Sequence, residues 1–222
     1  MSKSLVLFQK LAIITMLLIT PRYSEFFTNK MPPMIIAFHG KAGSGKDTAA
    51  QYIISRFGED LVRQFAFADP LKRVVMRTHG LSEKEVYDPV LKEIMTKGTP
   101  VTPRHLLQSV GTIMREEIGP NVFVDAVSTK IASTKKPIVV VSDLRYPNEA
   151  EFVRGQGGLV VHLNRPDHSG TTLTSHSSEQ PLPAELVDLF IENDKDLATF
   201  FDRLETALSK SIENKLAVTW KE

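Results

Sequence analysis

Residues 34–48 read MIIAFHGKAGSGKDT, in which an apolar run breaks into a glycine-rich loop that ends in a lysine. The spacing G-x-x-x-x-G-K falls on Gly40, Gly45 and Lys46, which is the pattern of a phosphate-binding loop. Glycines let backbone N–H groups turn inward around phosphate oxygens, and the following helix points its positive end at them. A glycine-rich turn that binds nothing is the alternative, but the flanking strand-like and helix-like patterns disfavour it. The loop therefore predicts a site for the phosphate chain of a nucleoside triphosphate.

The two residues after this lysine bear on metal binding. Most such loops place Ser or Thr directly after the lysine, where the hydroxyl contacts Mg²⁺, whereas this sequence has Asp47 and then Thr48. A carboxylate is also a hard oxygen ligand that suits magnesium, directly or through water. The alternative is that Asp47 only stabilises the start of the following helix. We expect Mg²⁺ near these two residues, and the sequence leaves the choice between them open.

A second group of charged residues lies farther along the chain. Residues 138–149 read IVVVSDLRYPNE, so Asp143 ends an apolar run and Arg145 follows two residues later. Phosphate-loop enzymes place a Mg²⁺-positioning carboxylate at such a strand end, although a lone Asp there is more commonly a turn former or helix cap. Further cations stand after predicted strands or near the ends of predicted helices: Lys72, Arg104, Arg115 and Arg165. Any one of them taken alone reads as a surface charge, but phosphoryl transfer needs several fixed cations.

The pattern of elements that must position these residues is an alternation of strands and helices. Strand-like runs occur at 34–38, 62–67, 137–142, 159–164 and 189–192, and helical patterns at 46–57, 70–78, 82–96, 103–118, 121–133, 147–156 and 197–214. This alternation predicts an α/β fold in three layers, with a mainly parallel, doubly wound sheet of five strands. Ligands of such sheets bind beyond the carboxyl ends of the strands.

Composition limits the classes of function. The chain has 222 residues, 42% of them apolar, which suits one domain with a sizeable core. It has 27 basic and 26 acidic side chains, so we expect no nucleic acid or acidic membrane as a partner. The absence of cysteine excludes disulfides and thiolate zinc sites and fits a cytoplasmic protein, in the host cytoplasm if a phage encodes it.

Three segments depart from a simple alternation. Residues 1–33 contain the apolar run LAIITMLLIT, which is too short for a membrane span, and we interpret the segment as an extra apolar helix or as non-native sequence upstream of a start at Met31 or Met34. Residues 70–133 exceed a simple crossover and are expected to form a helical cap over a second substrate. Residues 164–183 are polar and rich in Gly, Ser, Thr and Pro, which is typical of a mobile loop that could act as a lid.

Seven segments in this order resemble the bacteriophage deoxynucleoside monophosphate kinase family: GKAGSGKDT, FADPLK, RHLLQSVGT, SDLRYPNEAE, HLNRPD, HSSE and IENDK. The resemblance covers nearly everything from Met34 to about Leu208, and the GKDT loop and the pattern SDxRxPNE are its most distinctive parts. It implies an adenylate-kinase-like phosphate-loop NTPase fold, with a nucleoside monophosphate kinase domain at 34–215. The implied reaction moves the γ-phosphate of ATP to a deoxynucleoside monophosphate, with Mg²⁺ as cofactor.

The resemblance also implies roles for individual residues. The ATP-binding set comprises Gly40, Lys41, Ala42, Gly43, Ser44, Gly45, Lys46, Asp47, Thr48, Arg165, Asn193 and Asp194. The acceptor-binding set comprises Lys72, Arg104, Arg115, Arg145 and Glu149. Catalysis would rest on Lys46, Asp143, Arg145 and Arg165, and magnesium on Asp47, Thr48 and Asp143. His176 and Glu179 match the HxxE of the family's lid without a defined role, and His176 could equally be an ordinary loop residue. Asn193 and Asp194 would pack against adenine, or else cap a helix.

Several alternatives stay open at this point. Dephospho-coenzyme A kinases and animal phosphomevalonate kinases carry related loops and lids. A GTPase-like switch is disfavoured because no guanine-reading N/T-K-x-D tetrapeptide occurs. A degenerate nucleotide-binding module without turnover is disfavoured because Lys46, Asp143 and Arg145 are retained. The sequence does not fix the oligomeric state, although homodimers are common among enzymes of this kind.

Overall fold

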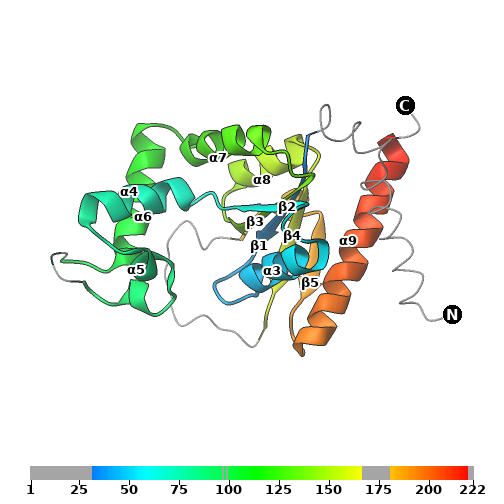
Figure 1. The fold of residues 1–222 in the computed structure, drawn as a ribbon, viewed down its shortest axis with the longest axis horizontal. Coiled ribbons are helices and arrows are strands. Elements are labelled where there is room, and N and C mark those ends of the chain that lie inside the picture. Colours follow the sequence, from blue (N-terminus) through cyan, green and yellow to red (C-terminus); the bar gives the residue numbers. More distant parts are fainter. Residues whose placement is uncertain (1–31, 97, 99, 167–180, 220–222) are drawn as a thin grey trace.

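The computed structural model describes residues 32–219 except residues 97, 99 and 167–180, and all that follows refers to these residues. Its centre is a five-stranded sheet in the order β2-β3-β1-β4-β5, in which every neighbouring pair is parallel (Figure 1). The strands are β1 (Met34–His39), β2 (Val62–Phe65), β3 (Ile138–Leu144), β4 (Leu159–Asn164) and β5 (Leu189–Glu192). The predicted three-layer α/β fold is therefore confirmed.

Helices cover both faces of the sheet because its central strands are apolar on both sides. On β1, Ile36 and Phe38 join the core under α3 (Lys46–Phe57) and α9 (Leu197–Thr219). Ile35 and Ala37 point to the other core, which also takes side chains from α4 (Asp69–His79), α7 (Val122–Ser133) and α8 (Pro147–Gly155). Strands buried on both faces are typical of parallel sheets between helical layers.

The long connection between β2 and β3 builds a helical projection beside the sheet. It carries α4, α5 (Glu83–Tyr87), the short 3₁₀ turn η1 (Leu91–Glu93) and α6 (Pro103–Glu117), which lie together on one side of the molecule (Figure 1). We call α4, α5, η1 and α6 the cap. α4 and α6 pack closely, since a Cβ on Gly111 of α6 would come within 3.0 Å of Leu71 of α4.

The prediction of one helix over 82–96 is wrong. Helix α5 ends at Tyr87, and Asp88 has extended backbone with ψ of 129°. The cause is Pro89, because a residue before proline is driven out of the helical region. The Asp88 carboxylate then accepts hydrogen bonds from the N–H groups of Val90 and Leu91, at 2.8 and 2.9 Å. These bonds start the turn η1 in place of a further helical turn.

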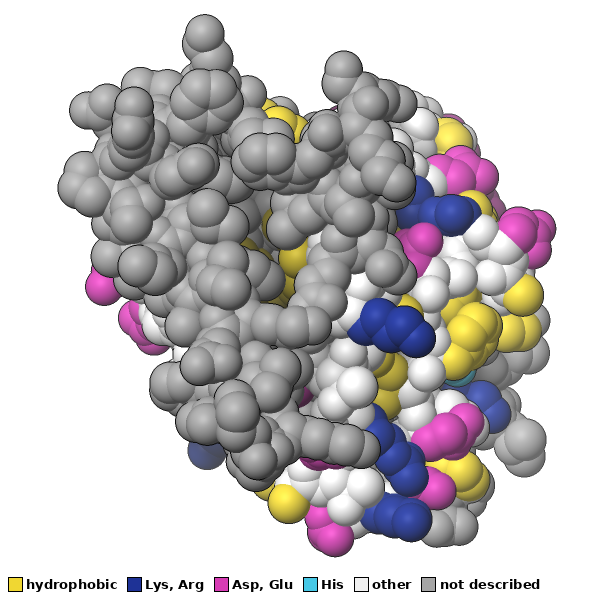
Figure 2. All heavy atoms as spheres, turned by 90° about the vertical axis from the view of Figure 1, so that its right-hand side faces the viewer, with side chains coloured by type: hydrophobic (Ala, Val, Ile, Leu, Met, Phe, Trp, Pro, Cys, Tyr) yellow, Lys and Arg dark blue, Asp and Glu magenta, His cyan; other side chains and the backbone are white. Residues whose placement is uncertain are grey.

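The carboxyl ends of all five strands meet at one edge of the sheet, so the segments that follow them are brought together there. Strand β3 runs to Leu144, two residues beyond the predicted end, so Asp143 lies within the strand. On the side of α9, the described surface mixes basic, acidic and apolar side chains (Figure 2). Within the described residues, every helix is too short or too polar to span a membrane.

Candidate active site

The loop between β1 and α3 is held in a shape that only glycine tolerates at two positions. Gly40 has a φ of +146°, and a Cβ there would lie 2.4 Å from the carbonyl oxygen of Leu163. Gly45 has a φ of +102°, and a Cβ there would lie 2.7 Å from Nδ2 of Asn193. The chain therefore wraps tightly between β4 and the segment after β5, with the N-terminus of α3 at its end. This is the backbone arrangement that binds phosphate.

Two polar side chains mark the interior of this loop. The ammonium group of Lys46 donates hydrogen bonds to the carbonyl oxygens of Gly40 and Lys41, at 2.7 and 2.8 Å. The hydroxyl of Ser44 is buried and has no hydrogen-bond partner among the described residues. Buried polar groups are seldom left without a partner. An oxyanion bound in the loop would supply acceptors for both groups.

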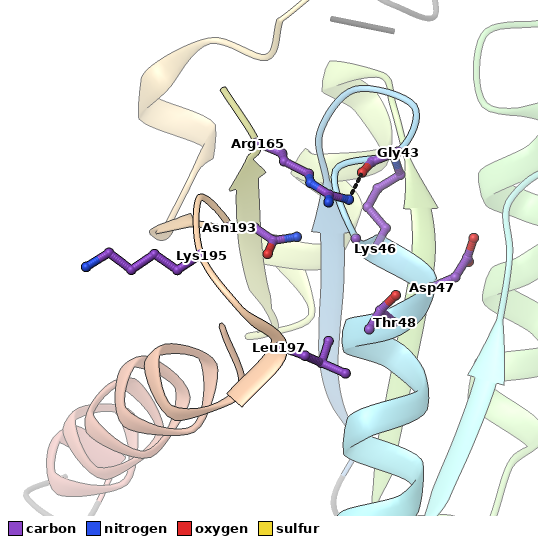
Figure 3. A pocket seen from close by; sticks show the side chains of 9 residues that line it. Gly43, Lys46, Asp47, Thr48, Arg165, Asn193, Lys195 and Leu197 are labelled. Carbon is purple, nitrogen blue, oxygen red and sulfur yellow. Dashed lines mark hydrogen bonds between the residues drawn. The ribbon is translucent and has the colours of Figure 1, made fainter. Parts of the chain in front are cut away.

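A pocket of about 340 Å³ opens beside this loop (Figure 3). Its lining comprises Gly43, Gly45, Lys46, Asp47, Thr48, Arg165, Asn193, Lys195 and Leu197. Arg165, after β4, donates to the carbonyl oxygen of Gly43 at 3.4 Å, and Asn193, after β5, donates to that of Ser44 at 3.0 Å. The structure thus brings Arg165 and Asn193 to the loop, as the sequence suggested, while Asp194 pairs with Arg203 at 2.6 Å and does not line the pocket.

Lys195 and Leu197 line the same pocket but were not singled out in the sequence. Leu197, the first residue of α9, is 55% exposed. The only signal in the sequence was the IENDK segment, of which Lys195 is the last residue and beyond which Leu197 lies by two residues. Together they offer an apolar side chain and a cation beside the phosphate loop.

The donor set beside the loop suits magnesium. Asp47 and Thr48 both line this pocket, and the carboxylate and hydroxyl of their side chains are hard oxygen ligands. Among the described residues no cluster of three or more His, Asp or Glu side chains forms a closed metal site. Magnesium does not require one, because it keeps several waters and uses phosphate oxygens as ligands. These two residues could hold the ion at the pocket wall.

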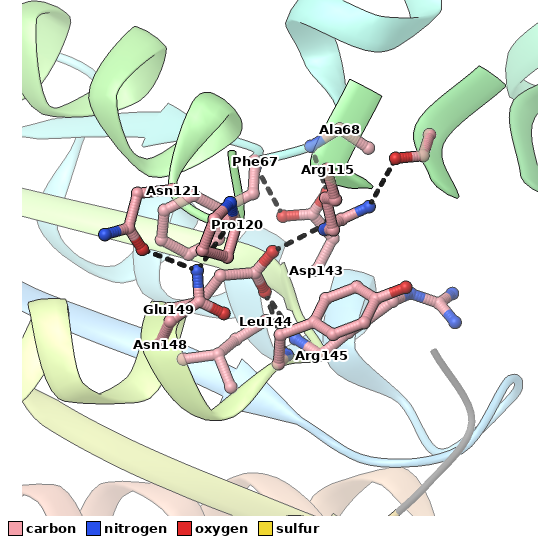
Figure 4. Close-up of polar contacts among 12 residues, drawn as sticks. Phe67, Ala68, Arg115, Pro120, Asn121, Asp143, Leu144, Arg145, Asn148 and Glu149 are labelled. Atoms are coloured by element: carbon pink, nitrogen blue, oxygen red, sulfur yellow. Dashed lines mark hydrogen bonds and ion pairs between the residues drawn. The ribbon is translucent and has the colours of Figure 1, made fainter. Parts of the chain in front are cut away.

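The Asp143 side chain, on β3, forms hydrogen bonds with the segment from which the cap begins. Its two carboxylate oxygens accept hydrogen bonds from the backbone N–H groups of Phe67 and Ala68, at 2.8 and 2.9 Å (Figure 4). Burial raises the pKa of Asp143, while these N–H groups and the charges of Lys72 and Arg145 act in the opposite direction. The carboxylate therefore fixes the turn from which α4 begins, and its predicted contact with magnesium stays a prediction.

Glu149 and Arg115 form a buried joint between the cap and the sheet (Figure 4). The Glu149 carboxylate accepts from the N–H groups of Arg145 and Tyr146, at 2.8 and 3.1 Å, and from Arg115 at 3.3 Å. Burial is the main factor that raises the pKa of Glu149 to about 7. Arg115 also lies 3.9 Å from the ring centre of Tyr146. Both side chains were predicted to bind an acceptor; in the structure both contact protein groups, and their binding of an acceptor stays a prediction.

The remaining predicted cations come together on the cap side. Lys72 of α4 lies 4.0 Å above the ring of Tyr87 and 4.0 Å from Asp69. Arg104, at the start of α6, forms a close ion pair with Glu93. The charges of Lys72, Arg104 and Arg145 all act on Lys92 of η1, a residue that no sequence pattern marked. The cap therefore presents a group of cations to the carboxyl edge of the sheet.

His39 lies between the two sets of cations. Its Nδ1 is 3.2 Å from the carbonyl oxygen of Leu144, which can only accept, so Nδ1 carries the proton. Burial lowers the pKa of His39 to about 4, the hydrogen bond to Leu144 opposes this, and the charges of Lys46 and Arg145 lower it further. The imidazole is thus neutral at neutral pH. Strands β1 and β3 are parallel neighbours, and His39 at the end of β1 is in register with Leu144 at the end of β3. The phosphate loop, which follows His39, and Arg145, which follows Leu144, therefore leave the sheet side by side.

Comparison with known proteins identifies this arrangement. A family model described as deoxynucleotide monophosphate kinase matches residues 83–204, more than half of the chain. A protein of Acanthamoeba polyphaga mimivirus, provisionally named as a deoxynucleotide monophosphate kinase, is 31% identical over 190 residues, which cover 77% of this chain and 94% of that protein. The chain belongs to the deoxynucleotide monophosphate kinase family. It is therefore a phosphotransferase, a nucleotide kinase, and the predicted family is confirmed.

Two phage proteins of this family are also similar to the chain. The deoxynucleoside-5'-monophosphate kinase of Escherichia phage T5 is 23% identical over 217 residues, which cover 69% of this chain and 87% of the phage protein. The deoxynucleotide monophosphate kinase of Escherichia phage RB69 is 40% identical over 70 residues, which cover 31% and 28%. His176 and Glu179, predicted to belong to the lid of these kinases, lie outside the described residues.

Proposed function

We propose that the protein transfers the γ-phosphate of ATP to a deoxynucleoside monophosphate and releases ADP and a deoxynucleoside diphosphate. The observation that carries this proposal is the adjacency of two cationic sites, one at the loop of Lys46 and one at Arg145 and the cap. A reaction that joins two phosphate groups needs such a pair of sites. Family membership supports the class of acceptor.

The donor site is the pocket beside the phosphate loop. The backbone N–H groups of the loop bind the phosphate chain, and the ammonium of Lys46 exchanges the carbonyls of Gly40 and Lys41 for phosphate oxygens. Arg165 stands at the mouth of this pocket and adds positive charge near the transferred group. Asn193 and Leu197 line the end where the nucleoside of ATP would lie. Magnesium, held at Asp47 and Thr48, would supply further neutralisation of phosphate charge.

We assign the acceptor site to residues 70–133, which include most of the cap and also α7, within a kinase domain of 34–215. Lys72, Arg104 and Arg145 bind the acceptor phosphate, whose oxygen attacks the γ-phosphorus in line. No general base is required, because a phosphate monoester with a second pKa near 6 is largely ionised at neutral pH. Catalysis then consists of alignment and charge neutralisation. Most of the segment 164–183, which was predicted to act as a lid, lies outside the described residues.

A panel of acceptors tests this function. Purified protein is incubated with ATP and Mg²⁺ and with each of dAMP, dGMP, dCMP, dTMP, their ribonucleotide counterparts, dephospho-coenzyme A and phosphomevalonate. Nucleotide products are separated by ion-exchange chromatography. We expect at least one deoxynucleoside monophosphate to be converted to its diphosphate, and EDTA to stop the conversion. Conversion of dephospho-coenzyme A or phosphomevalonate alone would overturn the assignment of the acceptor.

A further inference from the structure

Lys92 is held in an unusual place for a lysine on a surface turn. It lies on η1 (Leu91–Glu93), and the Asp88 carboxylate fixes the start of this turn through the N–H groups of Val90 and Leu91. Its side chain is only partly exposed. Within the described part of the chain, its ammonium group makes no hydrogen bond and no ion pair. Most lysines in such turns are extended into solvent, where the charge is hydrated.

The surroundings of Lys92 are positively charged. Burial is the main factor that lowers its pKa, and the charges of Arg104, Lys72 and Arg145 lower it further. Two carboxylates act in the opposite direction: Glu93, which is already paired with Arg104, and Asp88, which is already hydrogen-bonded to the N–H groups of Val90 and Leu91. The four cations come from four separate places in the fold: α4, η1, α6 and the segment after β3. Partly buried charges of one sign repel one another and weaken the protein unless an anion binds among them.

We propose that Lys92 binds the phosphate of the acceptor, as a fourth cation beside Lys72, Arg104 and Arg145. This inference rests on the proposed function and adds a residue to its acceptor site. A phosphate monoester fits the group because it carries up to two negative charges and three terminal oxygens, each able to accept several hydrogen bonds. A carboxylate, with one charge and two oxygens, would leave more of the repulsion uncompensated.

Lys92 gives the acceptor phosphate a contact from the outer part of the cap. Lys72 and Arg104 belong to the paired helices α4 and α6, whereas Arg145 belongs to the sheet edge. The turn η1 packs against α5 and α6, the helices beside it in the cap. Phosphate bound by both Lys92 and Arg145 would connect η1 to the sheet edge directly. Lys92 therefore serves acceptor binding and leaves ATP binding unaffected.

Kinetics of a neutral variant test this role. Lys92→Met keeps the length of the side chain and removes the charge. We expect the KM for the deoxynucleoside monophosphate to rise about 10- to 100-fold, and the KM for ATP to change less than about twofold. The matched control is Lys84→Met on the neighbouring helix α5, where the lysine is exposed. Both KM values of Lys84→Met are expected to stay within about twofold of the original protein.

A second measurement uses the unaltered protein and does not depend on folding of a variant or on turnover. The full chain is treated briefly with an acetylating reagent, and acetylation of Lys92 and Lys84 is measured by mass spectrometry. A deoxynucleoside monophosphate or inorganic phosphate should protect Lys92 several-fold and leave Lys84 unchanged, because only Lys92 would be covered by the anion.

The outcomes separate this inference from the proposed function. If no deoxynucleoside monophosphate is converted, the proposed function fails, and protection of Lys92 by inorganic phosphate still tests anion binding there. If conversion occurs but Lys92→Met has a normal acceptor KM and the lysine is not protected, the role of Lys92 is overturned while the kinase function stands. A rise in the KM for ATP equal to that for the acceptor would also contradict the proposal.

Discussion

The guanidinium of Arg115 lies 3.3 Å from the buried carboxylate of Glu149, and this pair joins the cap to the layer of helices beneath it. The same guanidinium stacks near the rings of Phe123 and Tyr146, at 4.4 and 3.9 Å from their centres. Glu149 in turn holds the backbone of Arg145. The pair therefore positions the segment that carries Arg145.

Arg115→Met should destabilise the protein more than it impairs acceptor binding. Removing the guanidinium leaves the Glu149 carboxylate, only 3% exposed, without its charged partner. Loss of one partner of a buried pair costs about 3 kcal/mol in the free energy of unfolding. Urea denaturation, monitored by circular dichroism, measures this change in the free energy of unfolding. Arg77→Met, on the exposed face of α4, is the control. A loss below about 1 kcal/mol would show that the pair contributes little to stability.

Local sequence patterns predicted much of the part of the candidate active site that would bind ATP. The phosphate loop is a run of consecutive residues whose backbone shape depends on glycine, so its function can be seen in the sequence. Arg165 and Asn193 were predicted because they follow strands, and parallel strands bring their carboxyl ends to one edge. The five strands could also be predicted from local patterns, because each is a short apolar run between helical patterns.

The cap side could not be predicted so well, because its contacts join residues far apart in the sequence. Arg115 looked like a ligand-binding cation, but its use depends on Glu149, Phe123 and Tyr146 from other elements. Lys92 lies in the segment LKEIM, which has no motif, and only the packing of η1 against α6 places it among other cations. The sequence shows that a residue is charged, but it does not show which other charged residues will surround it in the fold.

Gly45→Ala should weaken ATP binding with little change in the rest of the fold. Alanine at a φ of +102° is strained, and its Cβ would meet Nδ2 of Asn193 at 2.7 Å. The loop or Asn193 must move, which disturbs both the phosphate-binding backbone and the pocket wall. We expect the Kd for ATP, measured by isothermal titration calorimetry, to rise at least about 10-fold. Gly155→Ala is the control, since a Cβ there meets nothing within 4 Å.

His39 should make the protein less stable as the pH falls below 6.5. The folded protein holds the His39 pKa at about 4, below the ordinary value of 6.5, so the unfolded chain binds more protons between these values. The free energy of unfolding contributed by His39 is therefore complete above about pH 6.5 and falls as the pH decreases to about 4, by about 3 kcal/mol in all. Glu149 and Asp143, whose pKa values are raised, act in the opposite direction.

The His39 contribution can be isolated by comparison with His39→Gln, which lacks the titrating ring and keeps a polar side chain. The difference in unfolding free energy between the two proteins largely cancels the other titrating groups. We expect this difference to change by about 3 kcal/mol from pH 7 to pH 4, in favour of the variant at low pH. A difference that is constant over this range would mean that His39 does not titrate as its burial predicts.

Lys46→Met should lower kcat without unfolding the protein. The ammonium group donates hydrogen bonds to the carbonyl oxygens of Gly40 and Lys41 and does not belong to either hydrophobic core, so its loss leaves the core packing unchanged. In the reaction it would neutralise charge on the transferred phosphoryl group, and loss of one such contact costs about 10²- to 10³-fold in kcat. Lys210→Met, at an exposed position on α9, is the control.

Lys46→Arg should not restore the rate, because a planar guanidinium cannot occupy the place of a compact ammonium between two carbonyls. Turnover by Lys46→Met close to that of the original protein would show that the loop does not hold the reacting phosphates.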